Sequence, residues 1–145
     1  MDFRIVAGET YETLGEFFLN NGLEVSQLKT IKEGLIETYS IRDTNNMLIG
    51  AVSIVLIKGK YTVFDIAVDN DFRNKGYGEK LLDLAVKRIF EETDRVYLVA
   101  KAPKFFEKNG FFYVPKKDIP PIFHCLTCEQ YNLKCFPKVM CKTIR

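Results

Sequence analysis

Apolar and polar positions alternate over several short stretches of the chain, a pattern typical of β-strands. The first such stretch is Phe3–Ala7, which ends at a glycine. Three more follow in close succession, over Leu35–Ile41, Met47–Ile57 and Tyr61–Val68. The turns between these three are rich in Asp, Asn and Gly, the residues that most readily reverse a chain. The pattern therefore predicts an antiparallel meander of three strands.

Two other segments show the period of a helix. Apolar residues recur at helical spacing from Tyr11 to Phe18, directly after Thr10, which is a candidate N-cap. The clearest helix is predicted over Gly78–Glu92, where one wide face is apolar and the opposite face is charged. A compact strand, Val96–Ala100, follows it. Strand, helix and strand in this order form a βαβ unit, so the strands before and after the helix are expected to run parallel.

The last part of the chain is more irregular. Pro103 suits the first turn of a short helix, and Phe111–Val114 has the pattern of a further strand. Beyond Pro115 we expect an irregular tail, at about residues 119–145, which contains every cysteine of the chain. Because no repeat or linker divides the sequence, we expect a single domain over residues 1–145.

Composition narrows the range of partners. A chain of 145 residues suits one domain, and a hydrophobic fraction of 47% is enough for a core. The net charge of +2 is too small to indicate nucleic acid or a membrane surface as a partner. The longest apolar run, Ile49–Ile57, is too short to span a bilayer, and Asp2 and Arg4 interrupt any secretory signal. We therefore expect a cytoplasmic protein.

The cysteines form one cluster in the tail, at Cys125, Cys128, Cys135 and Cys141. A secreted scaffold would spread its cysteines along the chain, so we interpret these as reduced thiols. The same four residues have a spacing that can wrap a tetrahedral zinc, with His124 as a substitute ligand. Interleaved apolar residues favour packed thiols instead, so no metal is expected and zinc is the alternative.

The stretch from Val68 to Gly78 leads directly from a strand into the strongest predicted helix. A helix N-terminus presents unpaired amide N–H groups, and its dipole favours an anion such as a phosphate. Gly76 and Gly78 let the backbone approach the anion, and Arg73 and Lys75 add positive charge. A plain polar turn is the alternative. Neither a P-loop motif nor a complete dinucleotide-binding motif is present.

The sequence Arg73-Asn74-Lys75-Gly76-Tyr77-Gly78 resembles the R/Q-x-x-G-x-G/A acetyl-CoA motif of the GNAT N-acetyltransferases. Residues 102–111, A-P-K-F-F-E-K-N-G-F, are similar to the family's A-x-x-F-Y-E-K-x-G-F segment. A helix and a strand separate the two motifs, as in the family. The likeness covers nearly everything from Leu35 to Phe111.

This resemblance implies an α/β fold of the α+β type, with a twisted, mostly antiparallel mixed sheet, a parallel βαβ pair and flanking helices. It also implies acetyl-CoA as co-substrate, lying where the two parallel strands separate. The first strand would pair with the pantetheine, the loop amides would hold the pyrophosphate, and the short helix would border the cofactor. The residues so implied are Ile66, Ala67, Val68, Arg73, Asn74, Lys75, Gly76, Tyr77, Gly78, Phe105, Phe106 and Lys108.

Acetyl transfer to an amine needs a proton acceptor, an oxyanion donor and, for the departing thiolate, a general acid. The resemblance implies the backbone N–H of Val68 as the oxyanion donor. Family members often carry a tyrosine as this acid. In this chain the same position is Phe106, and phenylalanine cannot donate a proton. Either the thiolate leaves unaided or another phenol serves; the nearby ones are Tyr77, Tyr97 and Tyr113.

Two strand carboxylates, Asp65 and Glu37, are candidate bases that would act through a water. For each, a solvated carboxylate with no catalytic role is the alternative. The single histidine, His124, has no triad partners in the sequence and is not assigned as the base.

The tail gives the one indication of an acceptor. Its C-x-x-C pair, later cysteine and Met140 resemble the tails of short bacterial GNAT proteins of the N-acetylglutamate synthase type, although Cys141 departs from them. We expect direct attack by the primary amine of a small molecule, with an amino acid such as glutamate as leading candidate. The rivals are a non-catalytic acyl-CoA sensor, a protein N-acetyltransferase and a metal-binding interaction protein. A homodimer is left open.

Overall fold

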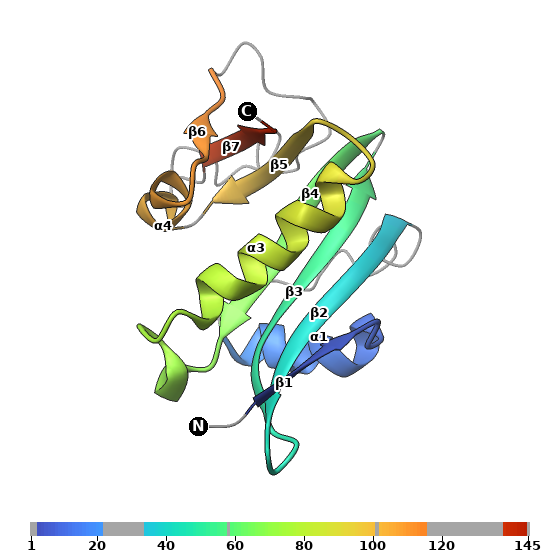
Figure 1. The fold of residues 1–145 in the computed structure, drawn as a ribbon, viewed down its shortest axis with the longest axis vertical. Helices are drawn as coiled ribbons and strands as arrows, with labels where there is room; N and C mark the ends of the chain where they lie inside the picture. Colours follow the sequence, from blue (N-terminus) through green and yellow to red (C-terminus); the bar gives the residue numbers. More distant parts are fainter. Residues whose placement is uncertain (1–2, 22–33, 58, 101, 116–137, 145) are drawn as a thin grey trace.

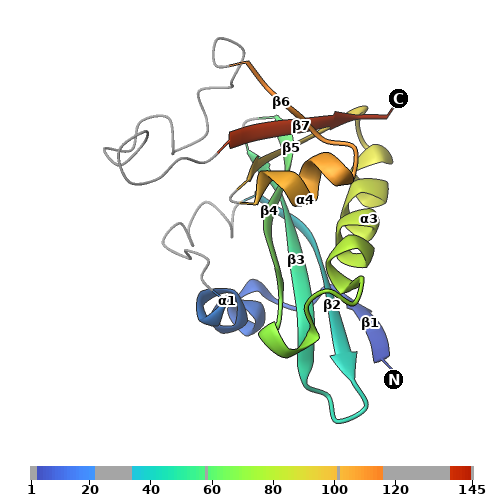
Figure 2. The same ribbon diagram turned by 90° about the vertical axis from the view of Figure 1, so that its left-hand side faces the viewer.

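A computed structural model describes residues 3–21, 34–57, 59–100, 102–115 and 138–144. In this part of the chain, seven strands form one sheet in the order β1-β2-β3-β4-β5-β7-β6. Helix α1 covers one face of the sheet, and α3 and α4 lie on the other (Figures 1 and 2). The elements are β1 (Phe3–Ala7), α1 (Tyr11–Asn20), β2 (Leu35–Asp43), β3 (Leu48–Ile57), β4 (Lys60–Val68), the 3-10 turn η1 (Asn70–Phe72), α3 (Tyr77–Phe90), β5 (Arg95–Ala100), α4 (Pro103–Lys108), β6 (Phe112–Tyr113) and β7 (Lys138–Thr143).

The predicted meander is confirmed as β2, β3 and β4, each antiparallel to the next. Its turns use the residues that the sequence indicated. Asn46 and Gly59 adopt positive φ angles of 67° and 84°, which a tight reversal needs. The carboxylate of Asp43 accepts the amide N–H groups of Asn45 and Met47 at 2.8 and 3.0 Å. The mixed sheet of the expected fold is thereby built mostly from local pairings.

The predicted parallel pair is also present, but it is short. Strand β5 meets β4 in register only at Thr62 and Tyr97. In Figure 1 the two strands start side by side and separate toward their arrowheads. An extra residue, Phe64, forms a β-bulge in β4, because Ser53 lies opposite Asp65 and Ile54 opposite Val63. A bulge bends its strand and increases the local twist, which accounts for the separation beyond Thr62.

The main core lies between the sheet and α3. Most of the apolar face predicted for this helix lies inside it: Phe90 packs against the core half-buried, and the buried residues are Leu81, Leu82, Ala85, Val86 and Ile89. Burial of a large aliphatic side chain contributes about 1.5–3 kcal/mol, so this face fixes α3 against β3 and β4. A second core lies under α1, where Tyr11, Leu14 and Phe18 pack on the opposite face of the sheet.

The end of the tail, residues 138–143, differs from the expectation of an irregular segment, while residues 116–137 lie outside the described residues. Lys138–Thr143 forms β7, which inserts between β5 and β6. Both faces of β7 are covered: Met140 is buried in the main core, while Val139 and Cys141 pack with Tyr97 on the other side. A strand buried on both faces shows no alternation of polar and apolar residues, so the sequence pattern does not reveal it. Cys125, Cys128 and Cys135, with His124, lie outside the described residues.

Gly50 of β3 allows a close approach of α3. A Cβ atom there would lie 2.9 Å from Leu81 Cδ1 and 3.0 Å from the carbonyl oxygen of Ala67. We predict that Gly50→Ala lowers the free energy of unfolding by about 1–3 kcal/mol, the cost of overpacking a core. Urea denaturation measures this change in the free energy of unfolding.

Gly15 in α1 is the matched control. A Cβ atom at this helical position meets only ordinary contacts, the nearest being Tyr11 Cε2 at 3.9 Å. Gly15→Ala should therefore raise the free energy of unfolding by about 0.5–1 kcal/mol. Equal effects of the two substitutions would contradict the packing argument.

Candidate functional site

Strand β4 presents backbone groups to the space that β5 leaves. The N–H of Asp69 donates to the carbonyl of Ile49 at 2.7 Å, and Ala67 lies opposite Ala51 in the register with β3. Along an antiparallel strand, successive residues direct their N–H and C=O groups to opposite sides. Ile66 and Val68 therefore direct theirs away from β3, toward the gap. This is the edge that the family resemblance assigns to the cofactor.

The loop after β4 is braced by its own side chains. The carboxylate of Asp69 accepts the N–H of Asp71 at 2.9 Å and closes the turn η1. Arg73 Nε donates to the carbonyl of Val68 at 3.1 Å, so this motif cation ties the loop to the end of β4. Asn74 has a positive φ of 63°. The loop thus has a defined shape before any ligand binds.

Gly76 ends the loop and caps α3. Its φ of 86° lies in the left-handed region, and its carbonyl accepts the N–H of Lys80 at 3.1 Å. A Cβ atom at Gly76 would meet nothing within 4 Å among the described residues, so open space lies directly over the helix N-terminus. The first-turn amides, which begin at Tyr77, have no acceptor within the helix. Space, amide donors and helix dipole together fit a phosphate group.

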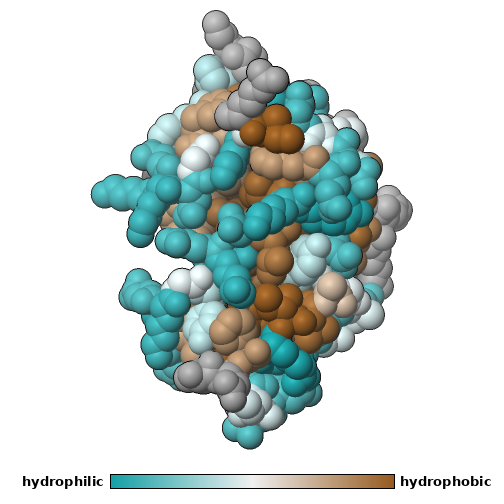
Figure 3. Space-filling model, in the orientation of Figure 1, coloured by the Kyte–Doolittle hydropathy of each residue, from teal (hydrophilic) through white to brown (hydrophobic). Residues whose placement is uncertain are grey.

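The gap, the helix N-terminus and α4 meet at Gly78. A Cβ atom there would lie 3.4 Å from Phe105 Cζ and 3.7 Å from Val68 Cγ2. In Figure 3 the outline of the molecule is indented on the left between α4 and the start of α3. Val68 of β4, Gly78 at the start of α3 and Phe105 of α4 are therefore neighbours beside this indentation.

The remaining side chains of the two motifs have different surroundings. The Tyr77 ring contacts Phe3 and Phe72, at centroid distances of 5.5 and 6.2 Å. Lys75 Nζ lies 5.7 Å from the Phe72 ring centroid. Lys108 Nζ lies 3.7 Å from Glu79 Oε1, and both side chains are exposed, so this bridge from α4 to α3 contributes little.

Phe106, at the position where family members often carry tyrosine, belongs to the core. It is 6% exposed, and its ring contacts Phe105 at 5.1 Å and Phe111 at 5.8 Å between centroids. Phe105 is the less buried of the two α4 phenylalanines and lies against the helix N-terminus. Phe105 therefore borders the groove directly, and Phe106 supports it from behind.

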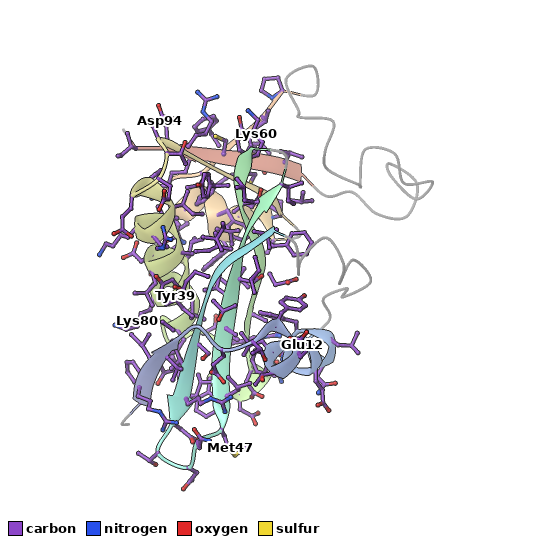
Figure 4. The ribbon with its side chains drawn as sticks, turned by 90° about the vertical axis from the view of Figure 1, so that its right-hand side faces the viewer. Glu12, Tyr39, Met47, Lys60, Lys80 and Asp94 are labelled. Atoms are coloured by element: carbon purple, nitrogen blue, oxygen red, sulfur yellow. The ribbon has the colours of Figure 1, made fainter. Side chains whose placement is uncertain are left out.

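The two candidate bases lie in different surroundings, with β3 between them. Asp65 is 4% exposed and accepts a hydrogen bond from the Tyr11 hydroxyl at 2.6 Å. Glu37 is half-buried and borders a pocket of about 370 Å³ whose other lining residues are Gly8–Glu12, Leu35, Ile36 and Thr38. In Figure 4, the labelled residues Glu12 on α1 and Lys80 on α3 lie on opposite faces of the sheet.

Tyr11 is the site neighbour that the sequence did not single out. The helical period identifies it as a residue that faces the sheet, yet gives no sign of its partner on β4. Burial, with the hydrogen bond to Asp65, raises the pKa of the Tyr11 phenol well above its usual value. The phenol is therefore a neutral donor throughout the physiological range.

Metal and membrane interpretations gain no support from the described residues. Among them, no group of three or more His, Cys, Asp and Glu side chains is placed to hold a metal. Cys141, the one cysteine they include, is 3% exposed, and burial raises the pKa of its thiol. None of the helices in the described ranges is both long and apolar enough to cross a bilayer.

Comparison with known proteins agrees with this geometry. Residues 36–112 match the acetyltransferase (GNAT) domain. An uncharacterized N-acetyltransferase of Chlorobaculum tepidum is 25% identical over an alignment 148 residues long. The alignment covers 97% of this chain and 93% of that protein. A GNAT-family acetyltransferase from Staphylococcus aureus Mu50 has a TM-score of 0.77 at 19% identity, covering 99% of this chain and 100% of that one.

N-acetylglutamate synthase of Neisseria gonorrhoeae, solved with coenzyme A and N-acetylglutamate, has a TM-score of 0.72 at 14% identity. The match covers 100% of this chain but only 36% of that one. These structures establish the fold, and the family domain spans more than half of the chain. The protein therefore belongs to the GNAT family and is an acetyl-CoA-dependent N-acetyltransferase.

Proposed function

We propose that this enzyme transfers the acetyl group of acetyl-CoA to the primary amine of a small molecule, by direct attack in a ternary complex. The observation that carries the proposal is the edge of β4 beyond Thr62, which pairs with no described strand and leads to the glycine-capped N-terminus of α3. An extended, amide-containing chain with a pyrophosphate at one end matches this sequence of donors and acceptors.

In this proposal the two motifs divide the cofactor between them. Backbone groups of Ile66 and Val68, with Ala67 between them, pair with the pantetheine. The amides and cations of the loop hold the pyrophosphate, and α4 borders the cofactor on its other side. The loop residues are Arg73, Asn74, Lys75, Gly76, Tyr77 and Gly78, and those of α4 are Phe105, Phe106 and Lys108.

The chemistry requires that the acceptor ammonium lose a proton, since amines have pKa values of about 8–10. Asp65 or Glu37 would accept that proton through a water, and the N–H of Val68 would stabilise the tetrahedral oxyanion. Phe106 cannot protonate the leaving group. A thiol with a pKa of about 8.5 nevertheless leaves as the thiolate near neutral pH, so no acid is required in this mechanism.

An amino acid such as glutamate is the leading acceptor. The resemblance of the tail and the likeness to the Neisseria enzyme's fold support it. The acceptor class can be tested with a panel of free amino acids, other small amines and lysine-containing peptides. The readout is thiol release from acetyl-CoA. Release with free amino acids is the expected result. Release with peptides alone would indicate a protein N-acetyltransferase, and acetyl-CoA binding without release would indicate a sensor.

We predict that Gly76→Asp weakens acetyl-CoA binding about tenfold or more, a loss of at least about 1.4 kcal/mol. The new carboxylate would enter the open space over the α3 N-terminus and repel the pyrophosphate. Isothermal titration with acetyl-CoA measures the change in Kd.

Gly59→Asp is the matched control, because Gly59 has a φ of 84° and no atom within 4 Å of an added Cβ among the described residues. Both variants therefore place a side chain at a left-handed φ, but Gly59 lies in the turn between β3 and β4. The assignment of the loop is wrong if folded Gly76→Asp binds acetyl-CoA as tightly as the control does.

Phe106→Tyr tests whether departure of the thiolate proceeds without an acid. We expect an unchanged Kd for acetyl-CoA and a kcat at least equal to that of the parent enzyme, since an added phenol supplies a donor. Steady-state kinetics with an acceptor from the panel gives both constants. A severe loss of kcat at unchanged Kd would show that the buried ring at this position is required as it stands.

A further inference from the structure

We infer that Tyr11 is a positioning residue for the reaction, whose hydroxyl holds the Asp65 carboxylate in the ionised form that accepts the proton. The inference rests on the proposed function, because it takes Asp65 as the base. It adds a residue from outside both family motifs, on the face of the sheet opposite α3.

The contact itself is short and fixed from both sides. Tyr11 Oη donates to Asp65 Oδ2 at 2.6 Å, and the Ser53 hydroxyl donates to the same oxygen at 3.2 Å. The Asp65 backbone N–H in turn donates to Ser53 Oγ at 3.1 Å. The carboxylate therefore has little freedom to rotate. Hydroxyl donors to a carboxylate favour its charged form, which is the form that a general base needs.

The structure also fixes Tyr11. It is the first residue of α1, and the N-cap Thr10 accepts the N–H of Thr13 at 3.2 Å, which anchors the start of the helix. The Tyr11 ring is 1% exposed and packs with Phe18 at a centroid distance of 5.8 Å. Tyr11 also belongs to the lining of the pocket that Glu37 borders. It thus lies between this pocket and the buried carboxylate.

Among the described elements that pack against β4, few titratable side chains are buried on the side of Asp65. Strand β3, which pairs with β4, carries none. On α1, Glu12 and Glu16 are exposed, and Tyr11 is the titratable residue buried against the sheet. Glu37 lies on β2, beyond β3.

On the other neighbours of β4, Tyr97 of β5 belongs to a separate cluster with Val139 and Cys141. The charged residues of α3 lie across the sheet, because its buried face is apolar. Tyr11 and Ser53 are the two hydroxyl donors to Asp65 that the described part of the chain shows, so a variant of each tests its own contribution.

Tyr11→Phe, which keeps the ring and its packing, tests the inference with two measurements. The first follows kcat against pH with an acceptor from the panel. The second follows the carboxyl ¹³C resonance of Asp65 against pH, assigned through Asp65→Asn, and needs no turnover. Loss of the donor makes ionisation harder, so the acid limb of kcat and the carboxyl midpoint should both move to higher pH, by about one unit.

Two further variants test whether the effect of Tyr11→Phe comes from the lost hydroxyl donor. Ser53→Ala removes the weaker donor and should move both midpoints in the same direction, by less. Tyr39→Phe removes a hydroxyl from β2 on the α3 face and should move neither. Kd for acetyl-CoA should stay the same in all three variants.

Each remaining outcome overturns the inference in an identifiable way. A carboxyl midpoint that moves while the acid limb does not would show that Asp65 is not the base. If neither moves, Tyr11 only holds α1 on the sheet. If the parent enzyme turns over no amine of the panel, the proposed function fails and the inference with it, while the resonance still reports the hydrogen bond.

Discussion

Beyond Thr62, the sheet separates in its middle, and the backbone groups of Ile66 and Val68 face a gap instead of a neighbouring strand. Arg73 bonds the Val68 carbonyl, but no described strand pairs with this edge, so the gap persists only where something else holds both strands in place. Strand β4 is held by β3 along its length, and β5 is held by β7. The apolar contacts of α3 then fix the loop at the end of the gap.

The two faces of the sheet at this point have opposite chemistry. On the α3 face, apolar packing sets the position of Gly76 and Gly78, and the features proposed to bind the cofactor are backbone groups. On the α1 face, a carboxylate and two hydroxyls are buried together under the start of the helix. The bulge at Phe64 connects the two features, since it bends β4 away from β5 close to Asp65. One irregular residue therefore shapes both sides of the site.

The parts of the site that are local in sequence could be predicted, and those that depend on distant contacts could not. The loop from Arg73 to Gly78 could be predicted because a strand, two glycines and a helix follow one another directly in the sequence. Periodicity identified Tyr11 as buried, but a period gives a face and no partner, and 54 residues separate Tyr11 from Asp65. Strand β7 was missed because its residues are covered on both faces and its partner lies far back along the chain.

The position of β7 has a consequence for the order in which the enzyme folds. Ala100 pairs with Lys138, so β5 obtains its long pairing only from a strand that is far downstream in the chain, whereas β2, β3 and β4 pair with immediate neighbours. Closing a longer loop costs more chain entropy, and a chain emerges from the ribosome N-terminus first. During synthesis the meander can therefore form before β5 is secured. The enzyme then acquires one wall of the proposed cofactor groove early, and the opposite wall only once β7 has been made.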